Sequence, residues 1–423
     1  MTESPFFHSL FLRVRLYLNT YHTRNYIEMK TSQKDSILKT LASLLVENSE
    51  KILNCNLLDL ELLKENDTPI IQRLMLSSNS ITSMAESLMS VALASDPQGV
   101  TLYKHIKNSG MRIENRSVPF GTVLIIYESR PDVTIEASAI AFKAGNMVLL
   151  KGGREARNTN MFLAELWQTA LKINNEDISR VRYLDIDRNK MMELIKGEDE
   201  KIDLIVPRGG EGLIDFVKSN ARVPYLISGR GNNFLFIHRL AHIDMAVSII
   251  LNGKSKQGVC NALDKVLIDC EYKDLKSVVS LLVYTLNYSG IEVLGSKRAG
   301  GLCDKISIVE SKEILREEFL SAKIYLEIVD GTDEAVDLIN KNSGGHSASI
   351  ITSDSGIAGR FMEEVDCAAV YHNASTRFTD GGEFGLGAEV AISTQKLHCR
   401  GPMGVSQLVT NKWYVFGNGD VRN

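Results

Sequence analysis

Apolar positions recur at helical spacing through the first part of the chain, beginning near Met29. Ser32 and Asp35 stand where a capping box would open a helix. Steps of three and four residues put apolar side chains on one face of an α-helix, and this pattern continues to about Leu93. The positions that set its first part are Ile37, Leu38, Leu41, Leu44, Leu45, Ile52 and Leu53.

After this helical region, short continuous apolar runs alternate with helical patterns. A strand that is buried on both faces is apolar at successive positions, and such strands separated by helices predict a parallel sheet covered on both sides. In a first stretch, strands are predicted at residues 122–127, 147–150 and 204–206, and helices at 134–145, 155–172 and 211–220. A second stretch starts near Phe234, with further strands predicted at 266–268, 324–329, 349–352 and 368–371. The sequence therefore predicts an α/β protein.

Length and charge limit the class of protein. A chain of 423 residues is too long for one ordinary core, so two or three domains are expected. The hydrophobic content of 44% and charged content of 24% are typical of a soluble globular protein. The net charge of −4, without any basic block, argues against a nucleic-acid partner. No apolar run approaches the roughly 20 residues of a membrane-spanning helix, so no membrane association is predicted.

The six cysteines form no C-x-x-C pair and no regular spacing. This pattern predicts free thiols in a reducing cytoplasm, and it argues against a disulfide framework or a zinc site. We therefore expect no metal. Residues 1–28 are aromatic and basic, with almost no acidic residues. We interpret them as an extension ahead of a start at Met29, with a targeting segment as the alternative.

Two predicted strand–helix junctions share one form. The strand at 147–150 runs into LKGGREA, and the strand at 204–206 runs into VPRGGEG. Glycines let a backbone approach a ligand closely, and the first amides of a helix bind anions. Each Gly-Gly pair is compatible with a plain turn, but two beside cations on one sheet also fit a phosphate-bearing ligand. The residues concerned are Lys151, Arg154, Gly209 and Gly210.

Cys260 lies in the segment GVCNA, between a basic run and an apolar stretch. The residues alone leave two interpretations open: a small buried side chain that fills a core, or a nucleophile.

Four segments are more specific: VPFGTVLIIYESRPDVT, LIVPRGGEGLIDFV, GVCNA and NASTRFTDGGEFGLGAEVAISTQKLHCRGPMG. They resemble the gamma-glutamyl phosphate reductase family, a branch of the aldehyde dehydrogenase superfamily. The resemblance runs in order from about Met29 to the C-terminus. It implies an aldehyde dehydrogenase-like fold with two doubly wound parallel-sheet domains and a small β oligomerisation element, and hence a homo-oligomer. The implied boundaries are 29–109 with 120–233 for the cofactor-binding domain, 234–390 for the catalytic domain, and 110–119 with 408–423 for the oligomerisation strands.

The resemblance implies NADPH-dependent reduction of L-glutamyl 5-phosphate to L-glutamate 5-semialdehyde, with release of phosphate, in proline biosynthesis. Cys260 matches the nucleophile that forms a thioester, and its neighbour Asn261 belongs to the same catalytic segment. The chain has no room for a kinase domain, so a separate glutamate kinase partner is expected. Two alternatives stay open: an aldehyde dehydrogenase with another acyl substrate, and a catalytically impaired nucleotide-binding relative.

Two positions depart from the family pattern. The family usually has Asn after Arg-Pro, where its amide completes an oxyanion hole, but this chain has Asp132. An ionised carboxylate accepts hydrogen bonds and would repel an oxyanion. Ile227 stands where many relatives carry a glutamate, which agrees with a reductase that protects its thioester from water.

The resemblance also assigns the binding residues. Cations at Lys151 and Arg154 favour the 2′-phosphate of NADP, Gly209 and Gly210 face the pyrophosphate, and Glu318 matches the residue that holds the nicotinamide ribose. For the substrate, donors and cations are expected at Thr376, Arg377 and Arg400, and an acceptor for the ammonium group at Glu383.

Overall fold

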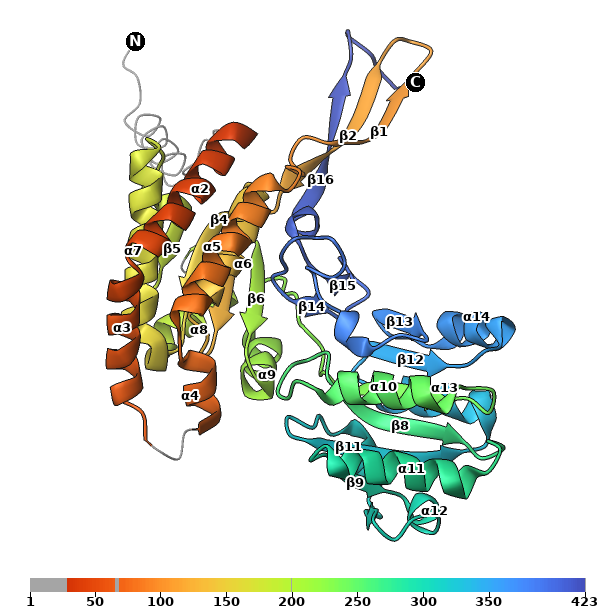
Figure 1. Ribbon diagram of the computed structural model, residues 1–423. Helices are drawn as coiled ribbons and strands as arrows, with labels where there is room; N and C mark the ends of the chain where they lie inside the picture. Colours follow the sequence, from red (N-terminus) through yellow and green to blue (C-terminus); the bar gives the residue numbers. More distant parts are fainter. Residues whose placement is uncertain (1–28, 65–67, 199, 423) are drawn as a thin grey trace, which may run out of the picture.

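The computed structural model describes residues 29–64, 68–198 and 200–422 (Figure 1). The predicted extension at 1–28 lies outside the described residues. Two parallel sheets, each with its own helices, lie side by side, and a narrow β arm extends away from them (Figure 1). The predicted α/β class with parallel sheets is confirmed by this strand pairing.

The first sheet is parallel and has the strand order β5-β4-β3-β6. Successive side chains of β3 enter opposite cores: Val123 and Ile125 pack beneath the N-terminal helices, whereas Leu124 and Ile126 pack against the other face. This explains why the strand is apolar at every position. Its strands are β3 (Thr122–Tyr127), β4 (Met147–Lys151), β5 (Val181–Tyr183) and β6 (Leu204–Arg208). The helices of this part are α2 (Thr31–Glu47), α3 (Ser49–Glu61), α4 (Thr68–Leu74), α5 (Ser78–Leu93), α6 (Val133–Lys143), α7 (Arg157–Ile173), α8 (Arg188–Lys196) and α9 (Glu211–Asn220).

Helix α2 begins at Thr31, one residue earlier than the predicted cap at Ser32. The capping position is Lys30, whose backbone amide donates to the side chain of Gln33. The predicted box of Ser32 and Asp35 is therefore wrong, because both residues already lie inside the first turns of the helix.

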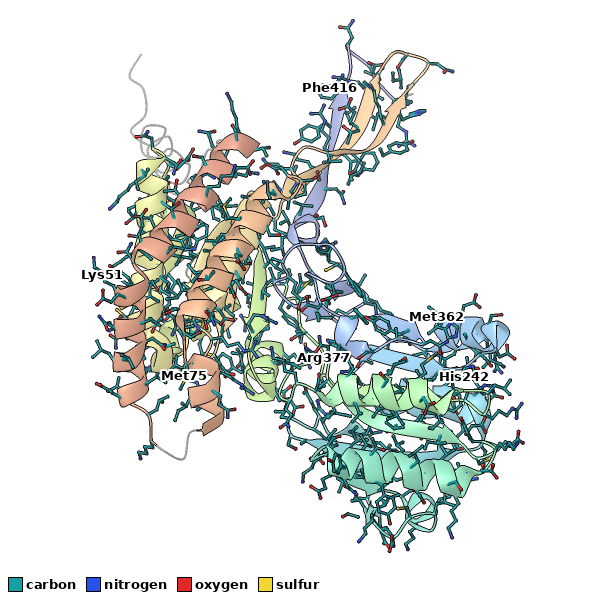
Figure 2. The ribbon with its side chains drawn as sticks, in the orientation of Figure 1. Lys51, Met75, His242, Met362, Arg377 and Phe416 are labelled. Atoms are coloured by element: carbon teal, nitrogen blue, oxygen red, sulfur yellow. The ribbon has the colours of Figure 1, made fainter. Side chains whose placement is uncertain are left out.

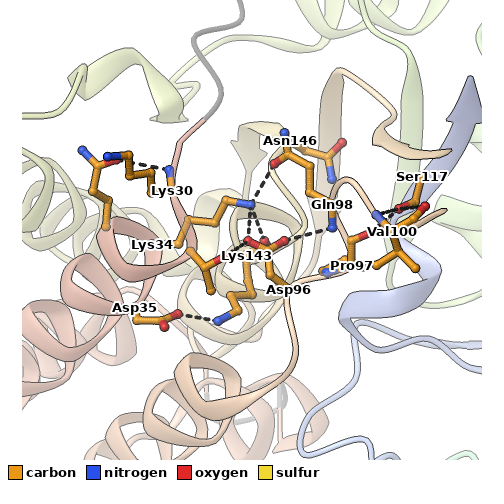
Figure 3. Close-up of polar contacts among 12 residues, drawn as sticks. Lys30, Lys34, Asp35, Asp96, Pro97, Gln98, Val100, Ser117, Lys143 and Asn146 are labelled. Carbon is orange, nitrogen blue, oxygen red and sulfur yellow. Dashed lines mark hydrogen bonds and ion pairs between the residues drawn. The ribbon is translucent and has the colours of Figure 1, made fainter. Parts of the chain in front are cut away.

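A buried polar network anchors α2 to the neighbouring elements (Figure 3). The Lys34 ammonium donates to Asp96 at 2.8 Å, to Gln98 at 2.9 Å and to the backbone carbonyl of Lys143 at 3.1 Å. Lys143 in turn pairs with Asp35. Because Lys34 is only 1% exposed, its charge is stabilised by these acceptors rather than by water.

The second sheet is also parallel, with the order β10-β9-β11-β8-β7-β12-β13. Its central strands again divide their side chains between two cores, with Leu235 and Val266 on one face and Phe234 and Leu267 on the other. The strands are β7 (Asn233–Ile237), β8 (Leu263–Asp269), β9 (Glu292–Gly295), β10 (Ser307–Ile308), β11 (Lys323–Val329), β12 (Ser347–Ile351) and β13 (Ala369–His372). The covering helices are α10 (Ile243–Lys254), α11 (Leu275–Tyr288), α12 (Lys297–Gly300), α13 (Gly331–Asn342) and α14 (Ser355–Glu364).

The arm is a three-stranded antiparallel sheet in which β2 (Arg112–Pro119) lies between β1 (Thr101–Ile106) and β16 (Val409–Phe416). Strand β1 falls in the range that the sequence assigned to cofactor binding, but its hydrogen bonds join it to β2 instead. A short ribbon of β14 (Ile392–Ser393) and β15 (Gly401–Pro402) lies between the second sheet and β16 along the chain.

Candidate active site

A cleft of about 1490 Å³ lies between the two α/β parts, and both of them contribute lining residues. The loop at the end of β6, the loop before β8 and the segment 377–395 all contribute to its walls. Figure 2 labels Arg377, one of its lining residues, at the junction between the two α/β parts. Its lining includes Arg208, Gly209, Gly210, Cys260, Glu318 and Arg377.

Cys260 lies on the loop between α10 and β8, and its backbone is held in place by Asn233 and Gly231. The Asn233 side chain donates to the carbonyl of Cys260 at 2.7 Å and to that of Ala262 at 2.7 Å. Gly231 packs so closely beneath Cys260 that a Cβ atom would collide with its backbone. Two residues of the stretch GNNF at 231–234, Gly231 and Asn233, thus support the candidate nucleophile. Sequence reasoning missed this role, because the amide and the loop meet only in the folded chain.

The thiol of Cys260 is surrounded by charges of both signs. Burial raises its pKa to about 11, and the nearby carboxylates of Glu389 and Glu318 act in the same direction. The guanidinium of Arg208, and more weakly that of Arg130, lower the same pKa. The thiol of the free protein is therefore protonated near neutral pH.

The side-chain amide of Asn261 is already hydrogen-bonded within the protein and is not a free donor. Its side-chain nitrogen donates to the carbonyls of Arg377 and Thr379, each at 3.1 Å, and its side-chain oxygen accepts from the Arg377 guanidinium. The hydroxyl of Thr376 donates to the Asn261 carbonyl at 2.9 Å. Asn261 therefore fixes the Cys260 loop to the segment around Arg377.

Gly209 and Gly210 line the cleft at the carboxyl end of β6, directly before α9. A side chain at Gly209 would collide with Glu128 and Leu213. The amide of Gly210 donates to the Glu128 carboxylate at 2.9 Å. A ligand phosphate that uses this amide has to displace that carboxylate.

Glu318, on the segment just before β11, lines the same cleft. Burial raises its pKa, and the backbone amide of Gly231 opposes this effect. Lys151 and Arg154 lie at the end of β4, outside the walls of this cleft. The Lys151 ammonium donates to the carbonyl of Gly152 at 2.7 Å, and its partial burial lowers its pKa.

The structure does not bring the predicted substrate residues together. Arg377 lines the cleft, whereas Thr376 is buried behind it. The Arg400 guanidinium donates to the carboxylate of Asp366 at 2.8 Å and to the backbone carbonyl of Asp366 at 2.7 Å. Arg400 does not line the cleft. Glu383 is exposed and also lies outside the lining.

Asp132 does not line the cleft that holds Cys260; it lines a smaller cavity of about 320 Å³. Four residues border both spaces, so the two adjoin: Arg130, Arg208, Asp380 and Glu389. Sequence reasoning did not single out these residues. Arg208 is the basic residue of VPRGGEG and Glu389 belongs to the glycine-rich passage, but only the fold shows that they meet beside Cys260.

The comparisons with known proteins agree with this geometry. The family model "Aldehyde dehydrogenase family" matches residues 307–387. The chain is 42% identical, over 92% of its length and 95% of the relative's, to the gamma-glutamyl phosphate reductase of Nitratiruptor sp.. The crystal structure of gamma-glutamyl phosphate reductase from Thermotoga maritima matches with a TM-score of 0.89 and 38% identity, covering 94% of this chain and 96% of that one.

The chain belongs to the gamma-glutamyl phosphate reductase family. The predicted aldehyde dehydrogenase-like fold is thereby confirmed. An engineered glycolyl-CoA reductase with bound NADP⁺ shares the fold, with a TM-score of 0.65 and 15% identity over 93% of both chains. In the described part of the chain, no group of three or more His, Cys, Asp or Glu side chains is arranged to hold a metal ion. No helix of that part is long and apolar enough to cross a membrane.

Proposed function

We propose that this chain reduces L-glutamyl 5-phosphate to L-glutamate 5-semialdehyde with NADPH and releases phosphate, as a step of proline biosynthesis. The observation that carries the proposal is Cys260, which lies in the cleft between the two parallel sheets with Arg208 close enough to lower its pKa. The family's name supports the substrate.

In the proposed reaction, the sulfur of Cys260 attacks the acyl carbon and forms a C–S bond while the bond from that carbon to the phosphate oxygen breaks. The thiol proton leaves to solvent, and the phosphate departs with the bonding electrons. The positive charge of Arg208 stabilises the thiolate, and the backbone amide of Cys260 is the expected donor to the oxyanion. Asn233, Gly231 and Asn261 keep the sulfur in place.

The residues fit a nicotinamide dinucleotide, which would supply a hydride to the thioester carbon. The C–S bond would then break, releasing the aldehyde and returning the sulfur of Cys260 as the thiolate. Gly209 and Gly210 leave backbone exposed at the carboxyl end of a parallel strand, where such sheets bind nucleotides. Glu318 would hold the nicotinamide ribose. Lys151 and Arg154 would favour NADP through its 2′-phosphate, and the NADP⁺-bound structural neighbour supports this choice.

The surroundings of Ile227 favour reduction over hydrolysis of the thioester. Ile227 lines the cleft and is buried, and its amide donates to the side chain of Gln395 at 2.8 Å. An aliphatic side chain at this position supplies no base to activate water.

We also propose a homo-oligomer assembled through the β arm. The arm carries apolar side chains that are more than half exposed: Leu102, Ile106, Trp413 and Val415. The strand register puts Trp413 and Val415 on one face of the arm and Ile106 on the other, and exposed apolar side chains on a projecting sheet are typical of a protein interface. Replacing Leu102 and Val415 together with Glu should yield monomers by light scattering, whereas Lys276→Glu, an exposed position on α11 outside the arm, should not. Monomeric unaltered protein would contradict this assignment.

The partner and location follow from the proposed chemistry. Acyl phosphates are labile in water, so a separate glutamate kinase is the expected source of substrate. All six cysteines, which lie within the described residues, are free thiols, and this supports a cytoplasmic location.

The test is NADP⁺ reduction with glutamate 5-semialdehyde, with and without phosphate, by the unaltered protein and by Cys260→Ala. Phosphate-dependent formation of NADPH that disappears in the variant is the expected result. Activity without any need for phosphate would favour another acyl substrate. A silent protein that still binds NADP⁺ would favour the impaired nucleotide-binding relative.

A further inference from the structure

The smaller cavity next to the Cys260 cleft is lined by thirteen residues, six of which are charged. It lies between the start of α6 and the glycine-rich segment 380–390. Its lining contains four carboxyl groups and two guanidinium groups: Asp132, Glu136, Asp380, Glu389, Arg130 and Arg208. Because four of these residues also border the cleft, a molecule that reacts at Cys260 can extend into this cavity.

Several of these charged groups are held without partners. Within the described residues, no hydrogen bond or ion pair engages the side chains of Arg130, Arg208 or Glu136. The Nε atom of Arg208 and the Oε2 atom of Glu389 are buried and have no hydrogen-bond partner. Buried polar atoms are normally paired, so unpaired ones of both signs around one cavity point to a ligand that completes them.

The electrostatics agree with an incomplete site. Burial raises the pKa of Glu136 and of Glu389 to about 7 each, and burial lowers the pKa of Arg208. Each of these pKa shifts means that burial destabilises the charged form of the side chain more than its neighbours stabilise it in the free protein. A ligand that carries an ammonium group and a carboxylate would supply the missing partner to both kinds of side chain.

The arrangement favours an organic cation over a metal ion, because no metal-holding group of carboxylates exists in the described residues. The excess of acids over guanidinium groups favours a ligand whose positive charge enters this cavity. A carboxylate on the same ligand matches the planar donors of the arginines.

We propose that the smaller cavity holds the amino-acid end of the substrate, with Glu389 and Asp380 accepting from its α-ammonium group and Arg130 and Arg208 binding its α-carboxylate. This places the distal acyl carbon of a five-carbon amino acid at Cys260. The inference rests on the proposed function and deepens it. It replaces Glu383 and Arg400 as the expected head-group residues, since neither lines the cleft or the cavity.

The experiment pairs variants with truncated substrates in the NADP⁺-reducing direction with phosphate. The substrates are glutamate 5-semialdehyde, 5-oxopentanoate, which lacks the amine, and 4-aminobutanal, which lacks the carboxylate. Loss of a charge-assisted hydrogen bond is equivalent to about 10- to 150-fold in kcat/KM. In Glu389→Gln, the ratio of kcat/KM for glutamate 5-semialdehyde to that for 5-oxopentanoate should fall by this factor, because any effect of this carboxylate on the Cys260 thiol is common to both substrates. In Arg130→Met, the ratio of kcat/KM for glutamate 5-semialdehyde to that for 4-aminobutanal should fall by the same factor.

Two further variants control the result. Glu363→Gln removes an exposed carboxylate on α14 and should leave all three substrates unchanged. Glu389→Asp keeps the charge and should restore part of the preference for the amine, which a merely structural defect would not allow. NADP⁺ binding by each variant shows that it is folded.

Failure of the proposed function and failure of the head-group assignment give different results. If the unaltered protein shows no phosphate-dependent activity, the proposed function fails. If it is active but Glu389→Gln lowers activity equally with and without the amine, the head-group assignment is overturned. Loss of amine selectivity in Glu383→Gln, with Glu389→Gln unaffected, would likewise overturn it.

Discussion

Alkylation of Cys260 by iodoacetamide measures how strongly the cleft suppresses its thiolate. With a pKa of about 11, the thiolate fraction at pH 8 is about 10⁻³. With the ordinary value of 9.0 it would be about 10⁻¹, so the net upward shift of the pKa costs roughly a hundredfold in reactive species, or about 3 kcal/mol.

The intrinsic reactivity of the thiolate offsets part of this loss. Nucleophilicity rises with pKa with a slope of about 0.4–0.5, so two units return nearly tenfold. We therefore expect Cys260 in the folded protein to react about tenfold more slowly than the same residue in urea-unfolded chain, before any steric hindrance. The rate should rise tenfold per pH unit up to at least pH 10.

Peptide mass spectrometry reads the rate at Cys260 separately from the other cysteines. Arg208→Met removes the cation that lowers this pKa most, so the variant should react more slowly still at every pH below 10. A plateau in the rate of the unaltered protein below pH 9 would refute the raised pKa. An unchanged or faster rate in Arg208→Met would refute the electrostatic role of that guanidinium.

Three other changes test the framework of the fold and the site. Lys34→Met removes a buried ammonium and leaves a carboxylate without its partner, so the free energy of unfolding should fall by about 3–5 kcal/mol in urea titrations; an unchanged midpoint would contradict this. Replacing Lys151 and Arg154 together with Ala should reduce the preference for NADP over NAD at least about tenfold in binding titrations, by loss of two charged contacts; equal weakening of both cofactors would argue against a 2′-phosphate site. Gly231→Ala should displace the backbone of Cys260 and lower kcat about 100-fold while thermal unfolding still shows a folded protein; full activity would show that the loop adapts.

Strands that are buried on both faces could be predicted from the sequence because their apolar runs have no other explanation. The strand predicted at 122–127 and the helix predicted at 211–220 have those same bounds in the structure. Strand β1 could not be found in this way. All six of its residues are exposed, so its sequence carries no burial pattern, and only its pairing with β2 makes it a strand.

The residues of the candidate site also fall into those that the sequence could predict and those that only the fold identifies. The chemistry of Cys260 came from the resemblance, because a single cysteine in a loop has no pattern of its own. Glu383 and Glu389 lie six residues apart in one glycine-rich passage, and the sequence cannot choose between them. The fold distinguishes them: Glu383 is exposed, whereas Glu389 is half-buried and close enough to the Cys260 thiol to raise its pKa.

The departure at Asp132 takes on a different meaning in the folded chain. Its position in the family usually carries Asn as an oxyanion donor, but here it lines the smaller cavity and not the Cys260 cleft. Its charge adds to the burial that raises the pKa of Glu136, and it counteracts the lowered pKa of Arg208. A fourth carboxyl group in this cavity increases the attraction for an ammonium group. Asp132 in place of Asn therefore affects first how the amino end of the substrate is bound. Its effect on the chemistry at the Cys260 thiol follows from that binding.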